Sequence, residues 1–301
     1  MNKWLTKSCA FFCCISAYLL GSSAPPYSEL FIPDTENIEQ SAPSDISIGC
    51  VFKNEAPWLK EWIEYHRLIG VDHFYLYNNC SNDHYREVLL PYIKKGIVEL
   101  FDFPKPNFSN KDQNYMYNHT LALAKQQSKW LAIIDTDEFI NPLSSKDLKT
   151  YLQAKQRAAS VYITWQIFGT SGIQEIEPEQ LLIEKLIFRA PNGDPISEAW
   201  GKSIYQCQYT NSIDSAHKGT HPPRAYIAYP STNKIKINHY FFRTENYLYN
   251  VKLPRLVVWT AGHQFKSQQG ILNYLPIANS TKDTFMEHYV PFLKNKIFNN
   301  P

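Results

Sequence analysis

Cysteine is scarce in this sequence, and long cationic runs are missing from it. Three of the six cysteines fall within the first 14 residues, and the spacing of the other three, Cys50, Cys80 and Cys207, matches neither a disulfide framework nor a zinc site. Thirty lysines and arginines against 28 acidic residues give a net charge of +2 with no basic block. Nucleic acid is therefore not an expected partner.

Charged residues are also few, at 19%, whereas hydrophobic residues make up 44% of the 301 positions. This balance predicts a globular chain with enough apolar surface to form a core. The length is near the ceiling for a single core, so we expect one large domain or slightly more. Aromatic residues are abundant, at 15%. Partly exposed tyrosine and tryptophan rings suit the apolar faces of sugars, although core packing is the commoner role of any one ring.

The N-terminal apolar stretch is shorter than a spanning helix requires. Lys3 and Lys7 precede the apolar residues 9–20, and small residues follow as far as Ala24. A transmembrane helix needs about 20 apolar residues. We interpret residues 1–24 as a signal peptide or a retained membrane anchor, and we expect a protein of the secretory pathway or an exported one. Residues 25–44, rich in proline, are predicted to be a linker.

From residue 45 onward, short apolar runs alternate with segments of helical periodicity. Strands are predicted at 46–52, 71–77 and 97–101, with helices between them. The βαβαβ order favours a parallel sheet covered by helices, so the expected fold class is α/β. Mixed strands near 202–208 and 234–242 predict a mixed C-terminal subdomain, and residues 256–301 read as a helical tail.

Two acidic residues follow the next predicted strand. Residues 130–134 are apolar and lead into Asp135, Thr136 and Asp137. Ligands of open α/β sheets gather at the carboxyl ends of strands, and two carboxylates at this spacing can hold one divalent ion beside phosphate oxygens. Haloacid-dehalogenase-type phosphatases also use this spacing, with the first aspartate as nucleophile, and remain a remote alternative.

Further blocks follow one another in order along the chain. They are Cys50-Val51-Phe52-Lys53-Asn54-Glu55, Glu61-Trp62-Ile63-Glu64-Tyr65-His66, Tyr77-Asn78-Asn79, Ile134-Asp135-Thr136-Asp137-Glu138-Phe139, Phe168-Gly169-Thr170-Ser171-Gly172, Gly201-Lys202-Ser203-Ile204 and Asn238-His239-Tyr240-Phe241. Together they resemble glycosyltransferase family 92 and the related bacterial family-2-like enzymes. The resemblance implies a GT-A type, Rossmann-like, mostly parallel sheet flanked by helices. It also implies a UDP-sugar donor, often of galactose, a divalent ion such as Mn²⁺ or Mg²⁺, and inversion at the anomeric carbon.

The resemblance also implies roles for particular residues, carried over position by position. The donor is contacted by Lys53, Asn54, Glu55, Asn78, Ser81, Asp83 and Gln113, and its diphosphate by Lys202 and Arg243. The metal is held by Asp135 and Asp137 with a histidine, for which His239 is preferred to His217. The general base is assigned to Glu184, with Asp214, Glu198 and Glu138 as alternatives. For each loop residue an ordinary turn or surface role is the competing interpretation.

The sequence therefore predicts an exported or membrane-anchored, metal-dependent GT-A glycosyltransferase, with its catalytic domain in residues 45–255. It is expected to move a hexose from a UDP-sugar to a hydroxyl of a glycan or glycoconjugate with inversion. A non-catalytic carbohydrate-binding protein on the same fold is the alternative.

Overall fold

The computed structural model describes residues 44–256 and 267–299. The predicted leader, 1–24, and almost all of the predicted linker, 25–44, lie outside these residues. In the described part of the chain, no helix is both long enough and apolar enough to cross a membrane.

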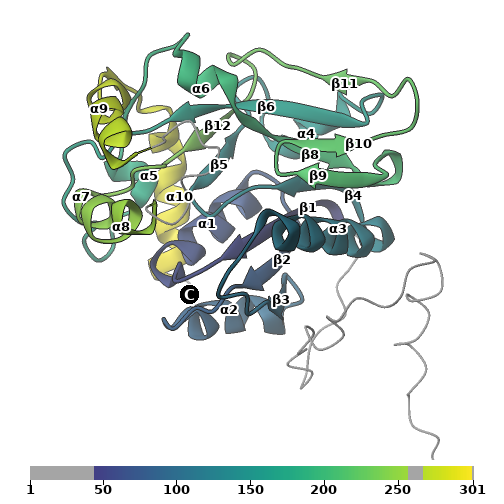
Figure 1. Cartoon of the computed structure of the whole chain (residues 1–301), viewed down its shortest axis with the longest axis horizontal. Helices are drawn as coiled ribbons and strands as arrows, with labels where there is room; N and C mark the ends of the chain where they lie inside the picture. The colour runs from purple at the N-terminus through teal and green to yellow at the C-terminus, as the bar shows by residue number, and fades with distance from the viewer. Residues whose placement is uncertain (1–43, 257–266, 300–301) are drawn as a thin grey trace, which may run out of the picture.

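One large sheet organises the described residues (Figure 1). Its strands follow the order β3-β2-β1-β4-β8-β6-β12-β5, and β11 pairs with β6. Their bounds are β1 Ser44–Phe52, β2 His73–Asn78, β3 Val98–Asp102, β4 Ser128–Ile133, β5 Glu138–Asn141, β6 Ser160–Ile167, β8 Gly201–Gln206, β11 Ile227–Ala228 and β12 Lys236–His239. Two short ribbons stand beside it, β9 Ser212–Ser215 with β10 Lys218–Thr220, and β7 Phe188–Arg189 with β13 Thr281–Lys282.

Most neighbouring strands of this sheet run in the same direction. β1 is parallel to both β2 and β4, and β6 is parallel to β11 and β12. β8 runs antiparallel between β4 and β6, and β5 runs antiparallel beside β12. The carboxyl ends of β1, β2, β4, β6 and β12 therefore share one edge of the sheet. The predicted α/β class with a mostly parallel sheet is confirmed.

Helices cover both faces of the sheet (Figure 1). Alternate residues of β2 belong to different cores, because Phe74 and Leu76 pack in the cluster around α1 whereas Tyr75 and Tyr77 pack in the cluster around α3. A strand buried on both faces reads as a continuous apolar run, as this one does.

The helices and helical turns are α1 Ala56–Leu68, α2 Tyr85–Lys94, α3 Asn110–Gln127, α4 Leu148–Gln153, α5 Leu182–Lys185, α6 Pro195–Ala199, η1 Cys207–Tyr209, α7 Glu245–Tyr247, η2 Leu248–Lys252, α8 Leu253–Leu256, α9 Gln268–Ala278, η3 Phe285–Tyr289, α10 Val290–Lys294 and η4 Asn295–Asn299.

The segment predicted to be a C-terminal helical tail packs as part of this domain. It contains helices α9 and α10, and it also supplies β13, which pairs with β7. Met286 and Leu293 are buried in the main core, and Lys60 of α1 donates a hydrogen bond to the carbonyl of Ile297 at 2.7 Å. Figure 1 shows α10 beside α1, so the end of the chain closes over its first helix.

A buried carboxyl on α1 holds the short helix α5. The Glu61 oxygens accept hydrogen bonds from the backbone N–H groups of Leu182 and Ile183, at 2.7 and 3.0 Å. Burial raises the pKa of Glu61 from 4.5 to about 7, although the two backbone donors oppose this shift.

This shift predicts a pH-dependent stability. The unfolded chain gives up the Glu61 proton near pH 4.5 and the folded chain near pH 7, so this contribution is complete below pH 4.5 and is lost as the pH rises to 7. The loss amounts to up to about 3 kcal/mol, at about 1.4 kcal/mol per pKa unit. We expect Glu61→Gln to flatten the unfolding free energy measured by denaturant titration across this window. A variant with the wild-type slope would contradict the assignment.

Candidate functional site

The Asp-Thr-Asp turn lies where β4 ends and β5 begins. The carbonyl of Asp135 accepts a hydrogen bond from Glu138 N–H at 3.1 Å, which closes a tight turn. β12 pairs antiparallel with β5, and this register sets His239 opposite Glu138. Sheet pairing thus brings His239 to the turn from a strand about a hundred residues further along the chain.

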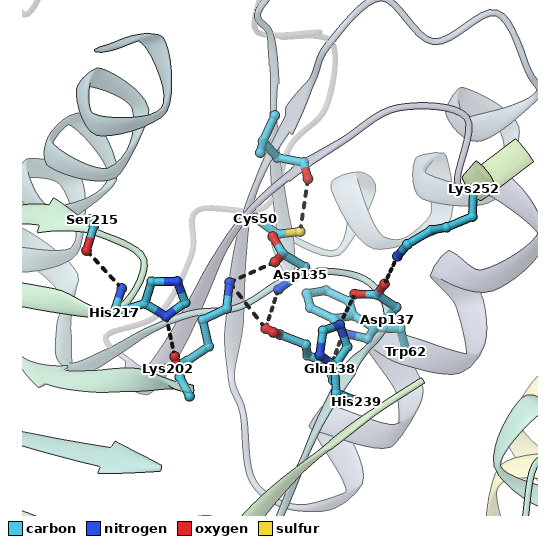
Figure 2. A network of polar contacts seen from close by, with 12 residues as sticks. Cys50, Trp62, Asp135, Asp137, Glu138, Lys202, Ser215, His217, His239 and Lys252 are labelled. Atoms are coloured by element: carbon cyan, nitrogen blue, oxygen red, sulfur yellow. Dashed lines mark hydrogen bonds and ion pairs between the residues drawn. The ribbon is translucent and has the colours of Figure 1, made fainter. Parts of the chain in front are cut away.

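Asp137 faces two basic side chains (Figure 2). Its Oδ1 atom is 3.4 Å from Nε2 of His239, and its Oδ2 atom is 3.2 Å from Nζ of Lys252. Burial alone would raise the pKa of Asp137, but Lys252 and His239 hold it well below the ordinary value. Burial lowers the pKa of His239 in spite of Asp137, so the ring favours its neutral form. An ionised carboxylate and a neutral imidazole are the forms that ligate metals.

Asp135 points to a different cation. Its Oδ2 atom is 2.7 Å from Nζ of Lys202, which also lies 3.5 Å from Oε2 of Glu138. Burial alone would lower the pKa of Lys202, but the two carboxylates raise it well above the ordinary value. Lys202 and Glu138 are buried, whereas 43% of the Asp135 side chain is exposed. Asp135 is therefore the acid of this turn that solvent reaches most easily.

The donor set fits a metal ion that also binds a substrate. Among the described residues, no group of three or more histidine, cysteine, aspartate or glutamate side chains is arranged to hold a metal. Asp137 and His239 form a pair, and their 3.4 Å separation suits two ligands of one ion with bonds of about 2.1 Å. Mg²⁺ is commonly held by one or two carboxylates together with substrate phosphates and water. The pair fits such a partial site, and Asp135 is engaged by Lys202.

The loops after β1 and β2 meet at the same edge, as the sequence predicts, but they bind each other. Asn54 N–H donates to Oγ of Ser81 at 2.9 Å, and the N–H of Ala56 at the start of α1 donates to Oδ2 of Asp83 at 2.8 Å. The Asn78 amide donates to Tyr85 and Asp102, at 2.8 and 2.9 Å. Asn54, Ser81 and Asp83, three of the residues assigned to the donor, thus have partners within these loops, and a fourth, Asn78, binds both Ser81 N–H and side chains of α2 and β3.

Two of the three other residues that the resemblance assigns to the donor, Lys53 and Gln113, differ in exposure. Lys53 is exposed at the end of β1. Gln113 is half-buried on the first turns of α3. Asn118, further along the same helix, exchanges hydrogen bonds with the backbone of Ile213 at 2.8 and 2.9 Å. Lys53 is therefore the residue of this set that is best placed to meet a ligand.

Arg243 and Glu55 form a buried ion pair behind the turn. Arg243 Nη2 is 2.5 Å from Oε2 of Glu55 and donates to Oγ1 of Thr136 at 3.2 Å. Its guanidinium lies between the rings of Trp58 and Tyr247, at 5.0 and 4.7 Å from their centroids. Only 1% of Arg243 is exposed. It therefore holds the turn through Thr136 in this structure and does not reach a surface where a diphosphate could bind.

Comparison with known proteins assigns the chain to a family. The model of glycosyltransferase family 92 matches residues 46–279, which is most of the described chain. The chain belongs to glycosyltransferase family 92. A family 92 protein of Ricinus communis is 26% identical over 174 residues, covering 54% of this chain and 30% of that protein. One of Arabidopsis thaliana is 29% identical over 132 residues, covering 42% of this chain and 21% of that protein. The match thus spans less than a third of these relatives.

Solved structures resemble the chain more distantly. S. aureus TarS (1–349) in complex with UDP is 13% identical, with a TM-score of 0.37, and the match covers 62% of this chain and 61% of that one. Glucosyl-3-phosphoglycerate synthase from Mycobacterium tuberculosis, in complex with Mn²⁺, UDP and glucosyl-3-phosphoglycerate, is 14% identical, with a TM-score of 0.34, and the match covers 56% of this chain and 59% of that one.

The structure leaves Glu184, the residue predicted as the general base, outside the acidic turn. Glu184 Oε1 accepts a hydrogen bond from Lys294 of α10 at 3.0 Å, and Oε2 accepts one from Leu181 N–H at 3.3 Å. The alternative Glu138 is completely buried, so an acceptor hydroxyl cannot contact it. Asp214 and Glu198 are both exposed, and each accepts a hydrogen bond from a residue close in sequence, Ser212 and Gly193 respectively.

Sequence reasoning missed Lys252 of this family 92 domain. It lies on the helical turn η2, and its amine is 3.8 Å from the centroid of Phe241 as well as 3.2 Å from Asp137. Nothing in the local pattern marks it, because its partner is 115 residues earlier in the chain. The nearest sequence signal is the block that ends in Phe241, a few residues before η2, and it does not point to Lys252 itself.

The buried ion pair yields a stability prediction. We expect Arg243→Met to cost about 3–5 kcal/mol of unfolding free energy, because it leaves the Glu55 carboxylate buried without its cation. Denaturant titration followed by circular dichroism measures the change.

Arg224 offers a matched control, since it also has a positive φ, 66° against 52° for Arg243, but is exposed. Arg224→Met should change the stability by no more than about 0.5 kcal/mol. Equal losses for the two variants would show that the ion pair does not carry the effect.

Proposed function

We propose that this family 92 domain transfers a hexose from a UDP-sugar to a hydroxyl of a glycan, with inversion, and that it depends on Mn²⁺ or Mg²⁺. Galactose is the sugar that the sequence resemblance favours. The observation that carries the proposal is the geometry of Asp137, whose two oxygens face His239 and Lys252 at the carboxyl edge of the parallel strands.

Charge is the main support for a diphosphate at this edge. Lys252 lies 3.2 Å from Asp137 and its side chain is 17% exposed, and exposed Lys53 follows β1 at the same edge. Lys202, which the sequence resemblance also assigns to the diphosphate, is buried against Asp135 and Glu138. A diphosphate that approaches Asp137 would therefore meet the amine of Lys252. Lysine binds phosphate as a compact point charge, and a site shielded from water strengthens the attraction.

Asp137 and His239 would hold the divalent ion. The ion would supply Lewis-acid stabilisation of the charge that develops on the leaving diphosphate. The chain itself contributes the placement of these two side chains, which β5 and β12 fix through their pairing, and the buried Arg243 that anchors Thr136 between the two aspartates.

Inversion also requires a base that removes the proton from the acceptor hydroxyl. The sequence assigns this role to Glu184, and it stays a prediction. The Lys294 contact of Glu184 would have to break for the carboxylate to reach an acceptor. The proposal therefore depends on Asp137 and not on the identity of the base.

Asp137→Asn tests the proposal directly. We expect release of UDP from a panel of UDP-sugars to fall by about 10²-fold or more, because an amide attracts a cation far less than a carboxylate does. In the wild type, a chelator should stop UDP release and added Mn²⁺ should restore it. Binding of Mn²⁺, followed by electron paramagnetic resonance, should weaken in the variant.

Asp45→Asn is the matched control. Asp45 lies near the start of β1, at the opposite edge of the sheet, and its carboxylate forms a surface ion pair with Lys149. This variant should keep full activity and Mn²⁺ binding. Undiminished sugar transfer by chelated wild type, or by Asp137→Asn, would refute the metal-dependent reaction.

A further inference from the structure

Three aromatic rings lie in a row beside His239. The ring of Trp165 is 4.5 Å from that of His239, His217 is 5.8 Å from Trp165, and Trp200 is 5.2 Å from His217, measured between centroids. We call Trp165, His217 and Trp200 the aromatic strip. Its exposure rises outward, from half-buried Trp165 and His217 to Trp200, which is 37% exposed.

Strand register explains why the two tryptophans stand on one face. β6 and β8 pair antiparallel with Thr164 opposite Gly201, and Trp165 N–H donates to the carbonyl of Trp200 at 2.9 Å, which continues this register by one residue. Residues directly opposite each other in an antiparallel pair project from the same face. Lys202 lies two residues beyond Trp200 and so shares this face, where it contacts Asp135.

We propose that the aromatic strip binds a sugar ring of the acceptor glycan, with an apolar face of the pyranose lying on Trp200 and Trp165. This inference rests on the proposed function and adds the acceptor side of the same site. Partly exposed indole rings combine a large apolar surface with a polar N–H, which matches the mixed surface of a pyranose.

The position of the strip favours the acceptor over the donor. Figure 2 shows His217 and Lys252 on opposite sides of the acidic turn. In an inverting transfer the acceptor hydroxyl attacks from the face opposite the leaving diphosphate. With the diphosphate drawn toward Asp137 and Lys252, the strip lies on the side from which the acceptor must come.

Calorimetric titration of the full chain tests this inference, with lactose and cellobiose as acceptor probes and UDP with Mn²⁺ as donor probe. We expect both disaccharides to bind the wild type, and Trp200→Ala to weaken their binding about two- to tenfold, the effect of losing one ring contact. Trp200→Phe keeps a ring and should restore most of the affinity. UDP affinity should be the same in all three proteins.

Tyr229→Ala serves as the control, because Tyr229 is an exposed aromatic residue, at 71%, that lies against Tyr162 and outside the strip. It should leave disaccharide binding unchanged. No disaccharide binding by the wild type, or equal binding by wild type and Trp200→Ala, would overturn the inference. UDP-sugar consumption, measured on the same samples, keeps the two proposals apart. If UDP-sugar is consumed but Trp200→Ala does not weaken disaccharide binding, only the role of the aromatic strip is rejected. If the disaccharides bind but UDP-sugar is not consumed, only the transferase reaction is rejected.

Discussion

The buried contact between Arg243 and Glu55 is the constraint on which the site depends. It joins three parts of the chain, since Glu55 ends the loop after β1, Thr136 lies between the two aspartates, and Arg243 begins the segment that leads to Lys252. Loss of either partner would leave the other charge buried without a counter-ion and would strongly destabilise the folded state. The three segments therefore hold one another in place. The turn is thus held through Thr136 and not through the aspartate carboxylates, which contact Lys202, Lys252 and His239 instead.

Charge balance around the turn follows from this arrangement. Asp135 lies against Lys202 and Asp137 lies against Lys252, whereas burial raises the pKa of Glu138 well above its ordinary value, so that carboxyl favours its neutral form. In a poorly hydrated site each carboxylate needs a nearby cation. In the proposed reaction, an arriving diphosphate would draw Lys252 toward itself and leave Asp137 short of positive charge. A divalent ion that entered with the nucleotide would restore the balance.

Much of this arrangement could be predicted from the sequence. The apolar runs located the strands, because a strand buried on both faces, such as β2, has no polar alternation to obscure it. The convergence of the loops after β1 and β2 followed from their parallel order. What the pattern could not supply was the direction of each polar side chain. Asn54 and Ser81 are of types that read a nucleoside or tie a turn, and in the fold the Ser81 hydroxyl accepts from Asn54 N–H while the Asn54 side chain accepts from Asn82 N–H.

Trp165 shows that the pairing register between strands carries information that the periodicity of one strand does not. It lies on the same face of β6 as Ile163 and Ile167, which are fully buried. The period of two along the strand therefore predicts another core residue at this position. It does pack partly on the core. Its proposed role depends instead on two neighbours that no local pattern connects to it, Trp200 before β8 and His239 at the end of β12. Sheet pairing sets Trp165 near the acidic turn, and pairing is a property of the whole chain.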